Sequence, residues 1–468
     1  MNGAWRSRER AGGCSGTEGR TDAAGRTRAT GRTGTTDRTG TTDRTGAGRF
    51  GAGLGRLVAG LLALLVATGC ADGTTGRTSA VTGDSPRTAA SASPPSYRGP
   101  IAAPAGDAFY TWPGPLPTGR PGDILWSRQI APTGPLAGLG VDLHQVLYLS
   151  TDAAGRPDAV SGSVLLPTGP ARANAPLVGF ATGTHGLGDT CAPSKGIAAG
   201  TDDWLDYFVA AARQGWAVAA TDYEGLGTPG THTYSVGRSE GHAVIDAVRA
   251  ARRLPDAGPP SDGPVAFWGY SQGGGAAAWA GELSPVYAPE LHTVAVAAGG
   301  VPADLSKVSE GVDGAEWSGA NIMSGIGLDA AYPELHLADH VTATIRDELD
   351  QLKKSCSKEL IPKFAGKKLA EALTSDLLHD PRWQQRLSEN SLGGSAPAAP
   401  ILLFHGGQDT VVDLGQARDL ARAYCADGAE VTWREYAGDD HEAASYRLED
   451  ATAFLADRFA GRPATSTC

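Results

Sequence analysis

Val265-Ala266-Phe267-Trp268-Gly269-Tyr270-Ser271-Gln272-Gly273-Gly274-Gly275 is the stretch that decides the predicted fold, and an alanine-rich helical pattern follows it. An apolar, β-prone run leads into a Gly-x-Ser-x-Gly pentad, and the order strand, sharp turn, helix is that of a nucleophile elbow. Small residues at Gly269 and Gly273 leave room for a strained serine backbone. The turn would place the Ser271 hydroxyl at a helix N-terminus, where developing negative charge is stabilised. A glycine-rich β–α turn without chemistry has the same local pattern, so an acid and a histidine must follow in suitable places.

Strands and helices alternate on both sides of this stretch. The sequence predicts strands at residues 143–150, 159–166, 175–181, 216–221, 264–268, 293–298, 400–404 and 429–436, and helices at 202–214, 240–253, 413–427 and 442–460. This alternation indicates an α/β fold with a mostly parallel sheet and helices on both faces. Residues 303–396 interrupt it with a mostly helical pattern, which we interpret as a helical cap inserted into a core formed by residues 101–302 and 397–468.

The first hundred residues have a different composition. Residues 1–48 are a low-complexity segment rich in Gly, Thr and Arg, which has too few apolar residues to form a core. Residues 49–70 combine arginines, an apolar run and small residues before Cys70, a pattern typical of a signal peptide. The end of this segment is similar to a bacterial lipoprotein processing site, so we expect either lipidation of Cys70 or plain secretion. Residues 71–100, rich in Ser, Thr, Gly and Pro, suit a flexible linker.

Charge and hydropathy limit the partners of the chain. Residues 1–56 contain eleven arginines and five acidic residues, which leaves a net charge of −17 for the rest of a chain whose total is −11. An acidic folded part argues against a nucleic-acid partner. No stretch after the export segment is long and apolar enough to span a membrane. Membrane contact is therefore expected only through a lipid on Cys70, and we expect a monomer.

The cysteines of the folded part indicate disulfides. Cys191, Cys356, Cys425 and Cys468 are four cysteines in an exported chain, which allows two disulfides and three possible pairings. Their spacing is not that of metal ligands, so we predict no metal site and no zinc.

An acid and a histidine do follow the serine. Asp409 comes just after the predicted strand that ends at Phe404, and His441 comes just after the next strand. Both would lie at the carboxyl edge of the sheet, close to Ser271. A serine hydroxyl needs a base to take its proton, His441 can act near neutral pH, and Asp409 would hold the imidazole in the correct tautomer. The order serine, aspartate, histidine is the order of α/β hydrolases, so we predict that fold.

Neighbouring residues are rival candidates. His405 adjoins the acid but closes a strand, and Asp439 and Asp440 adjoin the histidine that they would have to orient. We therefore expect structural capping roles for the two aspartates.

The oxyanion that forms during acyl transfer needs two backbone N–H donors. One should come from Gln272, directly after the nucleophile, and one from the loop after the strand at 175–181. Thr184, His185 and Gly186 lie in that loop, and we favour His185, then Gly186. A solvent-exposed loop residue is the alternative interpretation of His185.

The chain resembles the secretory lipase family, the lipase-A-type α/β hydrolases of fungi and actinobacteria. The matching motifs are Gly183-Thr184-His185-Gly186 with Asp189-Thr190-Cys191-Ala192-Pro193-Ser194, Thr221-Asp222-Tyr223-Glu224-Gly225, Gly269-Tyr270-Ser271-Gln272-Gly273, Tyr287-Ala288-Pro289-Glu290-Leu291, and the loops containing Gln408-Asp409 and Asp440-His441. The resemblance implies hydrolysis of triacylglycerols or other carboxylic esters, a helical cap over the serine, and no cofactor. It also implies the disulfide pairs Cys191–Cys356 and Cys425–Cys468.

Three functions remain open at this point. The first is a serine carboxylester hydrolase, secreted or anchored at the cell surface, acting on a small-molecule ester or lipid through an acyl-enzyme on Ser271. The second is a peptidase or other acyl transferase that uses the same three residues. The third is a lipoprotein that binds lipids without turning them over, and it has no need for Asp409 or His441.

Overall fold

The computed structural model describes residues 94–255 and 258–468. The predicted low-complexity and export segments, with Cys70, lie outside the described residues, as does most of the predicted linker 71–100. The end of that linker is held to the core, because the Tyr97 N–H donates to the Thr118 carbonyl over 3.0 Å and the Tyr97 hydroxyl donates to the Ile124 carbonyl over 2.8 Å. The prediction that the linker extends to residue 100 is therefore corrected by these contacts.

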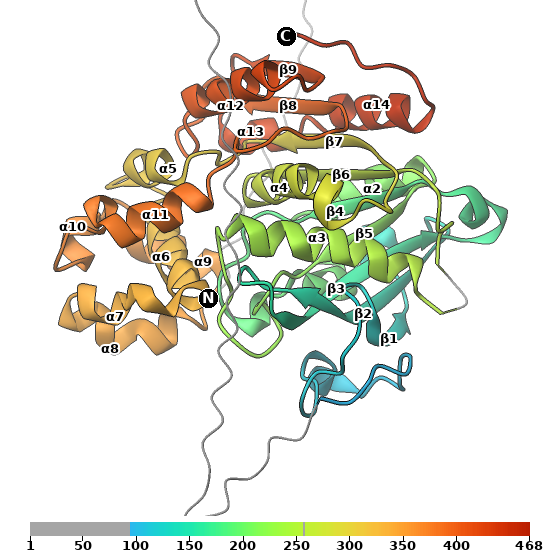
Figure 1. The fold of residues 1–468 in the computed structure, drawn as a ribbon, viewed down its shortest axis with the longest axis horizontal. Helices are drawn as coiled ribbons and strands as arrows, with labels where there is room; N and C mark the ends of the chain where they lie inside the picture. The colour runs from blue at the N-terminus through green and yellow to red at the C-terminus, as the bar shows by residue number, and fades with distance from the viewer. Residues whose placement is uncertain (1–93, 256–257) are drawn as a thin grey trace, which may run out of the picture. The chain divides into compact units, whose positions relative to one another are not determined.

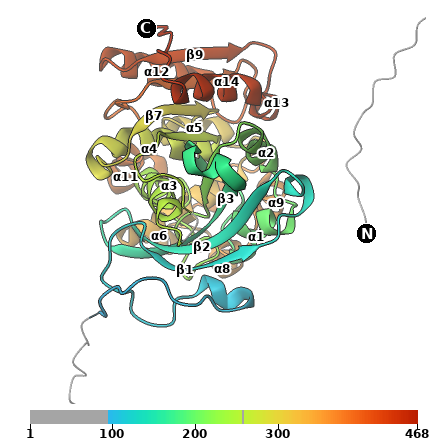
Figure 2. The same cartoon turned by 90° about the vertical axis from the view of Figure 1, so that its right-hand side faces the viewer.

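Nine strands form one sheet in the order β1-β2-β3-β5-β4-β6-β7-β8-β9. The strands are β1 (Ile124–Ile130), β2 (Val141–Thr151), β3 (Pro157–Pro167), β4 (Leu177–Ala181), β5 (Ala217–Thr221), β6 (Val265–Tyr270), β7 (Thr293–Gly299), β8 (Ile401–Gly406) and β9 (Val431–Tyr436). The strand pairs β1–β2, β2–β3 and β3–β5 are antiparallel. The other pairs, from β5 to β9, are parallel. Figure 2 shows the sheet running from β1 to β9. The predicted, mostly parallel sheet is confirmed, and β1 is an additional strand that the sequence pattern did not predict.

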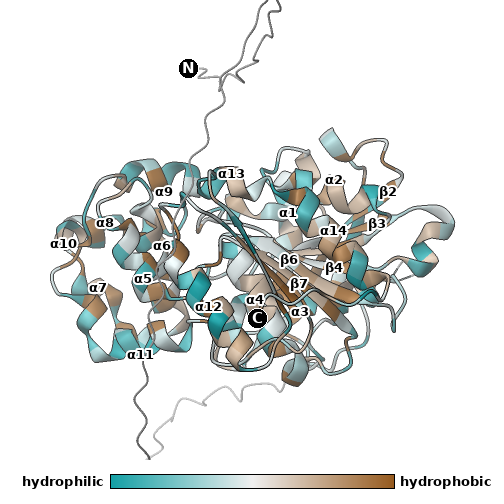
Figure 3. Ribbon diagram, turned by 90° about the horizontal axis from the view of Figure 1, so that it is seen from above, coloured by the Kyte–Doolittle hydropathy of each residue, from teal (hydrophilic) through white to brown (hydrophobic). Residues whose placement is uncertain are grey.

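Strand β6 is apolar along its whole length because both of its faces are buried. Val265 and Phe267 pack in the apolar cluster on one face of the sheet, whereas Ala266, Trp268 and Tyr270 pack in the cluster on the other face. This alternation follows the two-residue period of a strand. The central strands accordingly appear as an apolar block between helices in Figure 3.

Helices cover both faces of the sheet. Helices α3 (Gly237–Arg252), α4 (Gln272–Tyr287) and α12 (Leu414–Ala426) contribute to the first cluster, and α2 (Leu205–Arg213) and α14 (Leu448–Phe459) contribute to the second. The short helices α1 (Pro193–Ala199) and α13 (His441–Ser445) follow loops at the carboxyl edge of the sheet. The two-sided helical cover that the sequence predicts is confirmed.

A helical insertion lies between β7 and β8 and gathers to one side of the sheet in Figure 1. Its helices are α5 (Leu305–Val312), α6 (Gly319–Ala331), α7 (Leu337–His340), α8 (Ala343–Leu352), α9 (Ser357–Phe364), α10 (Leu369–Ala372) and α11 (Pro381–Glu389). We call these helices the cap. The cap has its own apolar cluster, which also includes Leu187, Tyr234 and Val236 from core loops. The cap is thus packed onto the loops at the carboxyl edge of the sheet.

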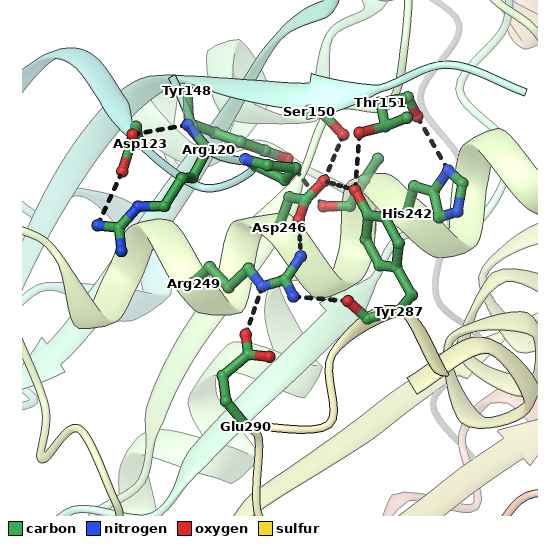
Figure 4. A network of polar contacts seen from close by, with 12 residues as sticks. Arg120, Asp123, Tyr148, Ser150, Thr151, His242, Asp246, Arg249, Tyr287 and Glu290 are labelled. Atoms are coloured by element: carbon green, nitrogen blue, oxygen red, sulfur yellow. Dashed lines mark hydrogen bonds and ion pairs between the residues drawn. The ribbon is translucent and has the colours of Figure 1, made fainter. Parts of the chain in front are cut away.

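A polar network joins the C-terminal half of α3 to the end of α4 and the residues after it, and Figure 4 shows its side chains, among them Asp246, Arg249, Tyr287 and Glu290. The Arg249 guanidinium donates to the Asp246 carboxylate over 2.9 Å, to Glu290 over 2.7 Å and to the Tyr287 carbonyl over 2.7 Å. The Tyr287 hydroxyl donates to Asp246 over 2.8 Å. The motif at residues 287–291 therefore fastens two helices whose other ends meet near Ser271.

The C-terminal segment differs from its prediction. The sequence predicts a single helix at 442–460, but α13 and α14 are separate because Arg447 leaves the helical conformation and its guanidinium binds the Asp439 carboxylate at 2.6 and 2.8 Å. The last residues then run along the edge of β9, where the Thr467 N–H donates to the Val431 carbonyl over 2.8 Å. A disulfide between Cys425 and Cys468 fastens this segment to α12. The tail thus covers a sheet edge that would otherwise present unpaired backbone groups.

Candidate active site

Ser271 occupies a strained turn between β6 and α4. Its backbone has φ 59° and ψ −126°, a combination that residues other than glycine rarely adopt. A Cβ atom added to Gly269 would lie 2.1 Å from the Gly273 carbonyl oxygen, and one added to Gly273 would lie 2.0 Å from the Ala181 carbonyl oxygen. Both glycines are therefore required for the close approach of strand, turn and helix, and the elbow has the geometry that its sequence predicts.

The structure brings the serine, the histidine and the aspartate together. The Ser271 Oγ lies 2.9 Å from His441 Nε2, and His441 Nδ1 lies 2.6 Å from Asp409 Oδ2. Asp409 follows the end of β8 and His441 begins α13 after β9, so the parallel strands deliver both side chains to the same edge. The three predicted residues form one continuous chain of hydrogen bonds.

Asp409 is held as an anion. Its Oδ1 accepts the backbone N–H groups of Val411 at 2.9 Å and Val412 at 2.8 Å. Burial raises the pKa of Asp409, but the hydrogen bonds from His405 and His441 lower it more, so that it lies well below its usual range. A fixed carboxylate can keep the hydrogen of the His441 ring on Nδ1 and leave Nε2 free to accept the serine proton.

His405 is more than the strand-closing residue that the sequence suggests. It is fully buried, its Nε2 lies 3.2 Å from Asp409 Oδ2, and the same nitrogen donates to the Val412 carbonyl over 2.8 Å. The spacing of four residues between His405 and Asp409, across the end of a strand, is the sequence pattern that could have indicated this contact.

The two aspartates before His441 have different roles. Asp440 accepts the Ala443 N–H over 2.8 Å and caps α13, as predicted. Asp439 does not cap this helix, because its carboxylate is bound by the Arg447 guanidinium described above, and its predicted capping role is wrong.

The loop after β4 is the segment that is predicted to supply the second oxyanion donor, and one of its residues lines the cavity at the serine. Thr184 lines the cavity that contains Ser271 and Gln272, whereas His185 and Gly186 do not. Gly186 has φ +119°, and a Cβ atom there would lie 2.5 Å from the Cys356 Cα. Its small size thus permits close contact with the cap. Thr184 thus lies on the cavity wall, and the assignment of the second oxyanion N–H to His185 or Gly186 stays a prediction.

Gln272 is the first residue of α4, so no turn of the helix precedes it to accept its backbone N–H. Its side-chain amide donates to Glu240 Oε1 over 2.8 Å and to His232 Nε2 over 3.1 Å. His232 Nδ1 donates to the Glu224 carbonyl over 2.8 Å, so its Nε2 is an acceptor. Sequence reasoning missed Glu240 and His232, because they come from α3 and the loop before it and meet Gln272 only in the fold.

Burial shifts the pKa values of both partners of Gln272. It raises the pKa of Glu240 to about 7 and lowers the pKa of His232 to about 4. Hydrogen bonds from Gln272 and from the Ser235 N–H partly offset the effect on Glu240. His232 is therefore neutral at neutral pH, in the tautomer that the hydrogen bonds require.

The cavity at Ser271 is mostly apolar and extends into the cap. The polar residues on its wall include Thr184, Glu240, Ser271 and Gln272. Its apolar wall includes Leu305, Trp317, Ile326, Leu328, Leu337, Val341, Ile345, Leu349, Leu369, Leu373, Leu377, Leu378, Trp383 and Leu387. Such a cavity excludes water from a bound apolar chain whose polar end lies at Ser271.

The cap is covalently joined to the loop after β4. A disulfide connects Cys191 and Cys356 with a Cα–Cα distance of 5.5 Å. The Leu187 N–H donates to the Ser355 carbonyl over 3.0 Å, and the Ser357 N–H donates to the His185 carbonyl over 2.8 Å. Cap and loop are thus paired along their backbones next to the serine.

The part of the chain that the structure describes contains no group of three or more His, Cys, Asp or Glu side chains arranged to hold a metal ion. In the same residues, no helix combines the length and the apolar character needed to cross a membrane.

Comparisons with known proteins identify the family and the fold. The sequence profile of the secretory lipase family matches residues 192–467. A probable inactive lipase of Mycobacterium tuberculosis is 29% identical over 77% of this chain and 84% of its own. A secreted triacylglycerol lipase of Malassezia furfur is 27% identical over 77% of each chain. Among solved structures, Candida antarctica lipase A is similar with a TM-score of 0.66 at 23% identity, over 75% of this chain and 85% of that one.

The structural similarity confirms the predicted α/β-hydrolase fold. The profile match covers more than half of the chain, including Ser271, Asp409 and His441. The chain therefore belongs to the secretory lipase family.

Proposed function

We propose that this protein is a serine carboxylester hydrolase that forms an acyl-enzyme on Ser271. The observation that carries the proposal is the continuous hydrogen-bond chain Ser271–His441–Asp409, which opens on an apolar cavity. Membership of the secretory lipase family supports a hydrolase of lipase or esterase type.

The chemistry follows from the geometry. His441 Nε2 accepts the proton of Ser271 as Oγ attacks the ester carbonyl carbon, and Asp409 stabilises the resulting imidazolium. The backbone N–H of Gln272 and one from the loop after β4, His185 or Gly186, would bind the oxyanion of the tetrahedral intermediate. His441 then gives its proton to the departing alkoxide, which leaves as an alcohol. A water molecule, deprotonated by His441, attacks the acyl-enzyme, and the carboxylic acid leaves as Ser271 Oγ regains its proton.

The substrate class follows from the cavity. A carboxylic ester with its carbonyl at Ser271 would place its acyl chain against the leucines and isoleucines of the cap. Burial of each methylene group stabilises the complex by about 0.8 kcal/mol, so longer chains should bind more tightly until the cavity is filled. Lipid-like esters are therefore the substrates that the site favours.

The experiment compares p-nitrophenyl esters of increasing acyl length, with Ser271→Ala as the blank. The proposal requires hydrolysis by the wild type and none by the variant. Gly325 lines the cavity, and the nearest atom to a Cβ added there is 3.8 Å away, so Gly325→Leu should fill part of it and shift the preferred ester to a shorter chain. Gly311→Leu is the matched control, because the added Cβ meets no atom within 4 Å at an exposed position of α5. Hydrolysis that survives Ser271→Ala would contradict the serine mechanism.

Binding of apolar ligands without turnover is the second candidate, because a relative from Mycobacterium tuberculosis is named as a probable inactive lipase. The intact hydrogen-bond chain at Ser271 argues against it here. If the protein only binds apolar ligands, the wild type and Ser271→Ala would bind a fluorescent fatty acid equally, and neither would hydrolyse an ester. A peptidase that uses the same three residues would instead hydrolyse a peptide amide. The p-nitrophenyl esters would then inhibit this amide hydrolysis only weakly.

We also propose that the protein is exported, which the secreted relatives support. The more specific proposal is that a lipid on Cys70 anchors the exported protein to the membrane. Labelling of expressing bacteria with an alkyne fatty acid would show incorporation into the wild type and none into Cys70→Ala. Release of both forms into the medium without label would indicate plain secretion.

A further inference from the structure

One side of the cavity at Ser271 is polar, although most of the cavity wall is apolar. Four residues of this side come from α3, from the loop before it and from α6 of the cap: Tyr234, Ser235, Glu240 and Ser324. We call them the polar wall. Glu240 lies close to the nucleophile elbow, because its Oε1 accepts the side-chain amide of Gln272 over 2.8 Å. A plain acyl chain has no group that pairs with these side chains, so the polar wall points to a second, polar part of the substrate.

Hydroxyl pairs run through the polar wall. The Ser235 hydroxyl is 3.0 Å from the Ser324 hydroxyl, and the Tyr234 hydroxyl is 3.0 Å from the hydroxyl of Thr184, which also lines the cavity. A hydroxyl has one hydrogen, so each pair uses only one of its two hydrogens. Within the part of the chain that the structure describes, the other hydrogen of each pair has no acceptor. The polar wall therefore offers two O–H donors to a ligand.

Glu240 adds an acceptor to this wall. Its Oε1 accepts the Ser235 N–H over 3.0 Å as well as the Gln272 amide, whereas its Oε2 accepts no hydrogen bond from residues 94–255 and 258–468. Glu240 is 3% exposed, so water has little access to its carboxyl group from the surface. A buried carboxyl oxygen without a hydrogen bond is costly. A donor on a ligand in the cavity would remove this cost.

The polar wall is held in place between the core and the cap. Ser235 has φ 67°, a left-handed conformation that residues other than glycine adopt mainly where surrounding contacts impose it. Helix α6 packs against the backbone of the same segment, since a Cβ atom added to Gly327 would lie 2.3 Å from the Tyr234 carbonyl oxygen. A ligand therefore meets hydroxyl and carboxyl groups that are already in position, and binding requires little ordering of the protein.

We propose that the substrate ester carries a polyol as its alcohol, with free hydroxyls that bind to the polar wall. A partial acylglycerol and an acylated sugar are esters of this class. The inference rests on the proposed function and names the alcohol that leaves when Ser271 attacks. A hydroxyl can donate to Glu240 Oε2 and at the same time accept from a hydroxyl of the wall, so a polyol matches both kinds of free group. The acyl chain then occupies the apolar part of the cavity in the cap.

The first test compares 1-decanoylglycerol with propyl decanoate, which has the same acyl chain and lacks the two free hydroxyls. Because the polar groups of the wall stay unpaired with the propyl ester, the wild type should show a kcat/KM about 10- to 100-fold higher for the glycerol ester. This preference should fall at least about fivefold in Ser235→Ala/Ser324→Ala and in Glu240→Gln, where an amide NH2 group replaces Oε2. The preference is a ratio, so a general loss of activity in a variant cancels.

Ser388→Ala is the matched control for these variants. Ser388 is an exposed serine of the cap helix α11 and does not line the cavity at Ser271. The preference for the glycerol ester should stay at its wild-type value in this variant.

A hydroxyl on the acyl chain is the other source of the same chemistry. Propyl 3-hydroxydecanoate and propyl decanoate separate the two sources, and the wild type should hydrolyse them at rates within about threefold of each other. A preference for the hydroxyacyl ester, with none for the glycerol ester, would overturn the assignment of the polar wall to the alcohol.

Binding without turnover provides a second measurement. The ether 1-O-decylglycerol cannot be hydrolysed, and it should displace a fluorescent fatty acid from Ser271→Ala at a concentration at least about fivefold lower than decyl propyl ether does. The difference should disappear when Ser235→Ala and Ser324→Ala are added to Ser271→Ala. Equal displacement by the two ethers would overturn the inference even if the protein hydrolyses no ester.

The kinetic outcomes separate the inference from the proposed function. The inference is overturned if the wild type hydrolyses 1-decanoylglycerol and propyl decanoate within about twofold of each other. It is also overturned if folded Ser235→Ala/Ser324→Ala, with a melting temperature near that of the wild type, keeps the full preference. Absence of any hydrolysis that depends on Ser271 would instead contradict the proposed function.

Discussion

Nε2 of His405 lies 3.2 Å from Oδ2 of Asp409, the same carboxylate oxygen that faces His441 Nδ1 at 2.6 Å. The Asp409 carboxylate is thus held by a second histidine, which is fully buried at the end of β8. Under the proposed mechanism, the two contacts to this oxygen have unequal consequences for the chemistry, because His441 is the histidine that lies within hydrogen-bond distance of Ser271.

Asp409→Asn should therefore reduce kcat far more than His405→Phe. The amide in Asp409→Asn no longer fixes the His441 tautomer, and losses of about 10,000-fold are typical of this change. His405→Phe leaves the Val412 carbonyl unpaired and loosens the carboxylate, which should cost about tenfold in kcat and about 1–3 kcal/mol in unfolding free energy. Steady-state kinetics on a short ester and chemical denaturation measure both effects. Equal losses of kcat in the two variants would contradict these roles.

The elbow can be tested by adding one methyl group at two positions of α4. Gly273→Ala places a Cβ 2.0 Å from the Ala181 carbonyl oxygen, so strand and helix must separate and hydrolysis should fall by more than about 100-fold. In Gly275→Ala the nearest atom is the flexible ring of Pro302, 3.2 Å away, so activity should stay within about threefold. Circular dichroism would confirm that both variants fold. Similar activities of the two would show that the close approach at Gly273 is not required.

Glu240 predicts a particular dependence of stability on pH. Its pKa is raised from 4.5 to about 7, so the folded state binds more protons than the unfolded state between these values, and Glu240 lowers stability as pH rises through this window. In Glu240→Gln the amide oxygen can still accept from Gln272, but it cannot ionise. Relative to the wild type, the variant should gain about 3 kcal/mol in unfolding free energy between about pH 4 and pH 8.

Urea denaturation of the wild type and Glu240→Gln at a series of pH values measures this difference. Glu389→Gln is a suitable control, since Glu389 is exposed and its pKa is lowered, which gives the opposite sign. A difference between Glu240→Gln and the wild type that does not change with pH would mean that Glu240 titrates normally.

The two disulfides should differ in their contribution to stability. Cys191–Cys356 spans 165 residues and Cys425–Cys468 spans 43, so loss of chain entropy in the unfolded state gives about 5 kcal/mol for the first and about 4 kcal/mol for the second. The double serine variant of the first pair should also lose activity, because the cap and the loop at Thr184 are joined there. The double serine variant of the second pair should keep kcat unchanged, since it fastens only the tail over β9.

Denaturation midpoints and ester kinetics of the two variants check both statements. Loss of activity in the variant of the second pair would contradict its assignment to the tail alone. Full activity in the variant of the first pair, at temperatures where it is folded, would show that the disulfide between cap and loop is not needed for hydrolysis.

The position of the triad could be predicted because it depends on topology more than on detail. Parallel strands place their carboxyl ends at one edge, so residues that directly follow β6, β8 and β9 meet there whatever the rest of the chain does. The strained backbone at Ser271 is likewise encoded locally, by the glycines two residues before and after it.

Other features could not be predicted because they depend on contacts between distant segments. Strand β1 contains polar residues at its exposed end, such as Arg128 and Gln129, and has no regular alternation. The bonds of Gln272 to Glu240 and His232 arise only when α3 and α4 pack side by side. The orientation of the His185 ring is likewise set by a distant residue, Asp202, seventeen residues further on.

The most direct test of the central claim is covalent trapping of the nucleophile. A p-nitrophenyl alkylphosphonate should release one equivalent of p-nitrophenol and leave the alkylphosphonyl group on the Ser271 hydroxyl oxygen, because the elbow, His441 and the oxyanion donors activate that oxygen alone. Peptide mass spectrometry then locates the adduct. The account predicts stoichiometric modification of the peptide that contains Ser271 and none in Ser271→Ala. An adduct on another residue, or no adduct on a wild type that hydrolyses esters, would contradict it.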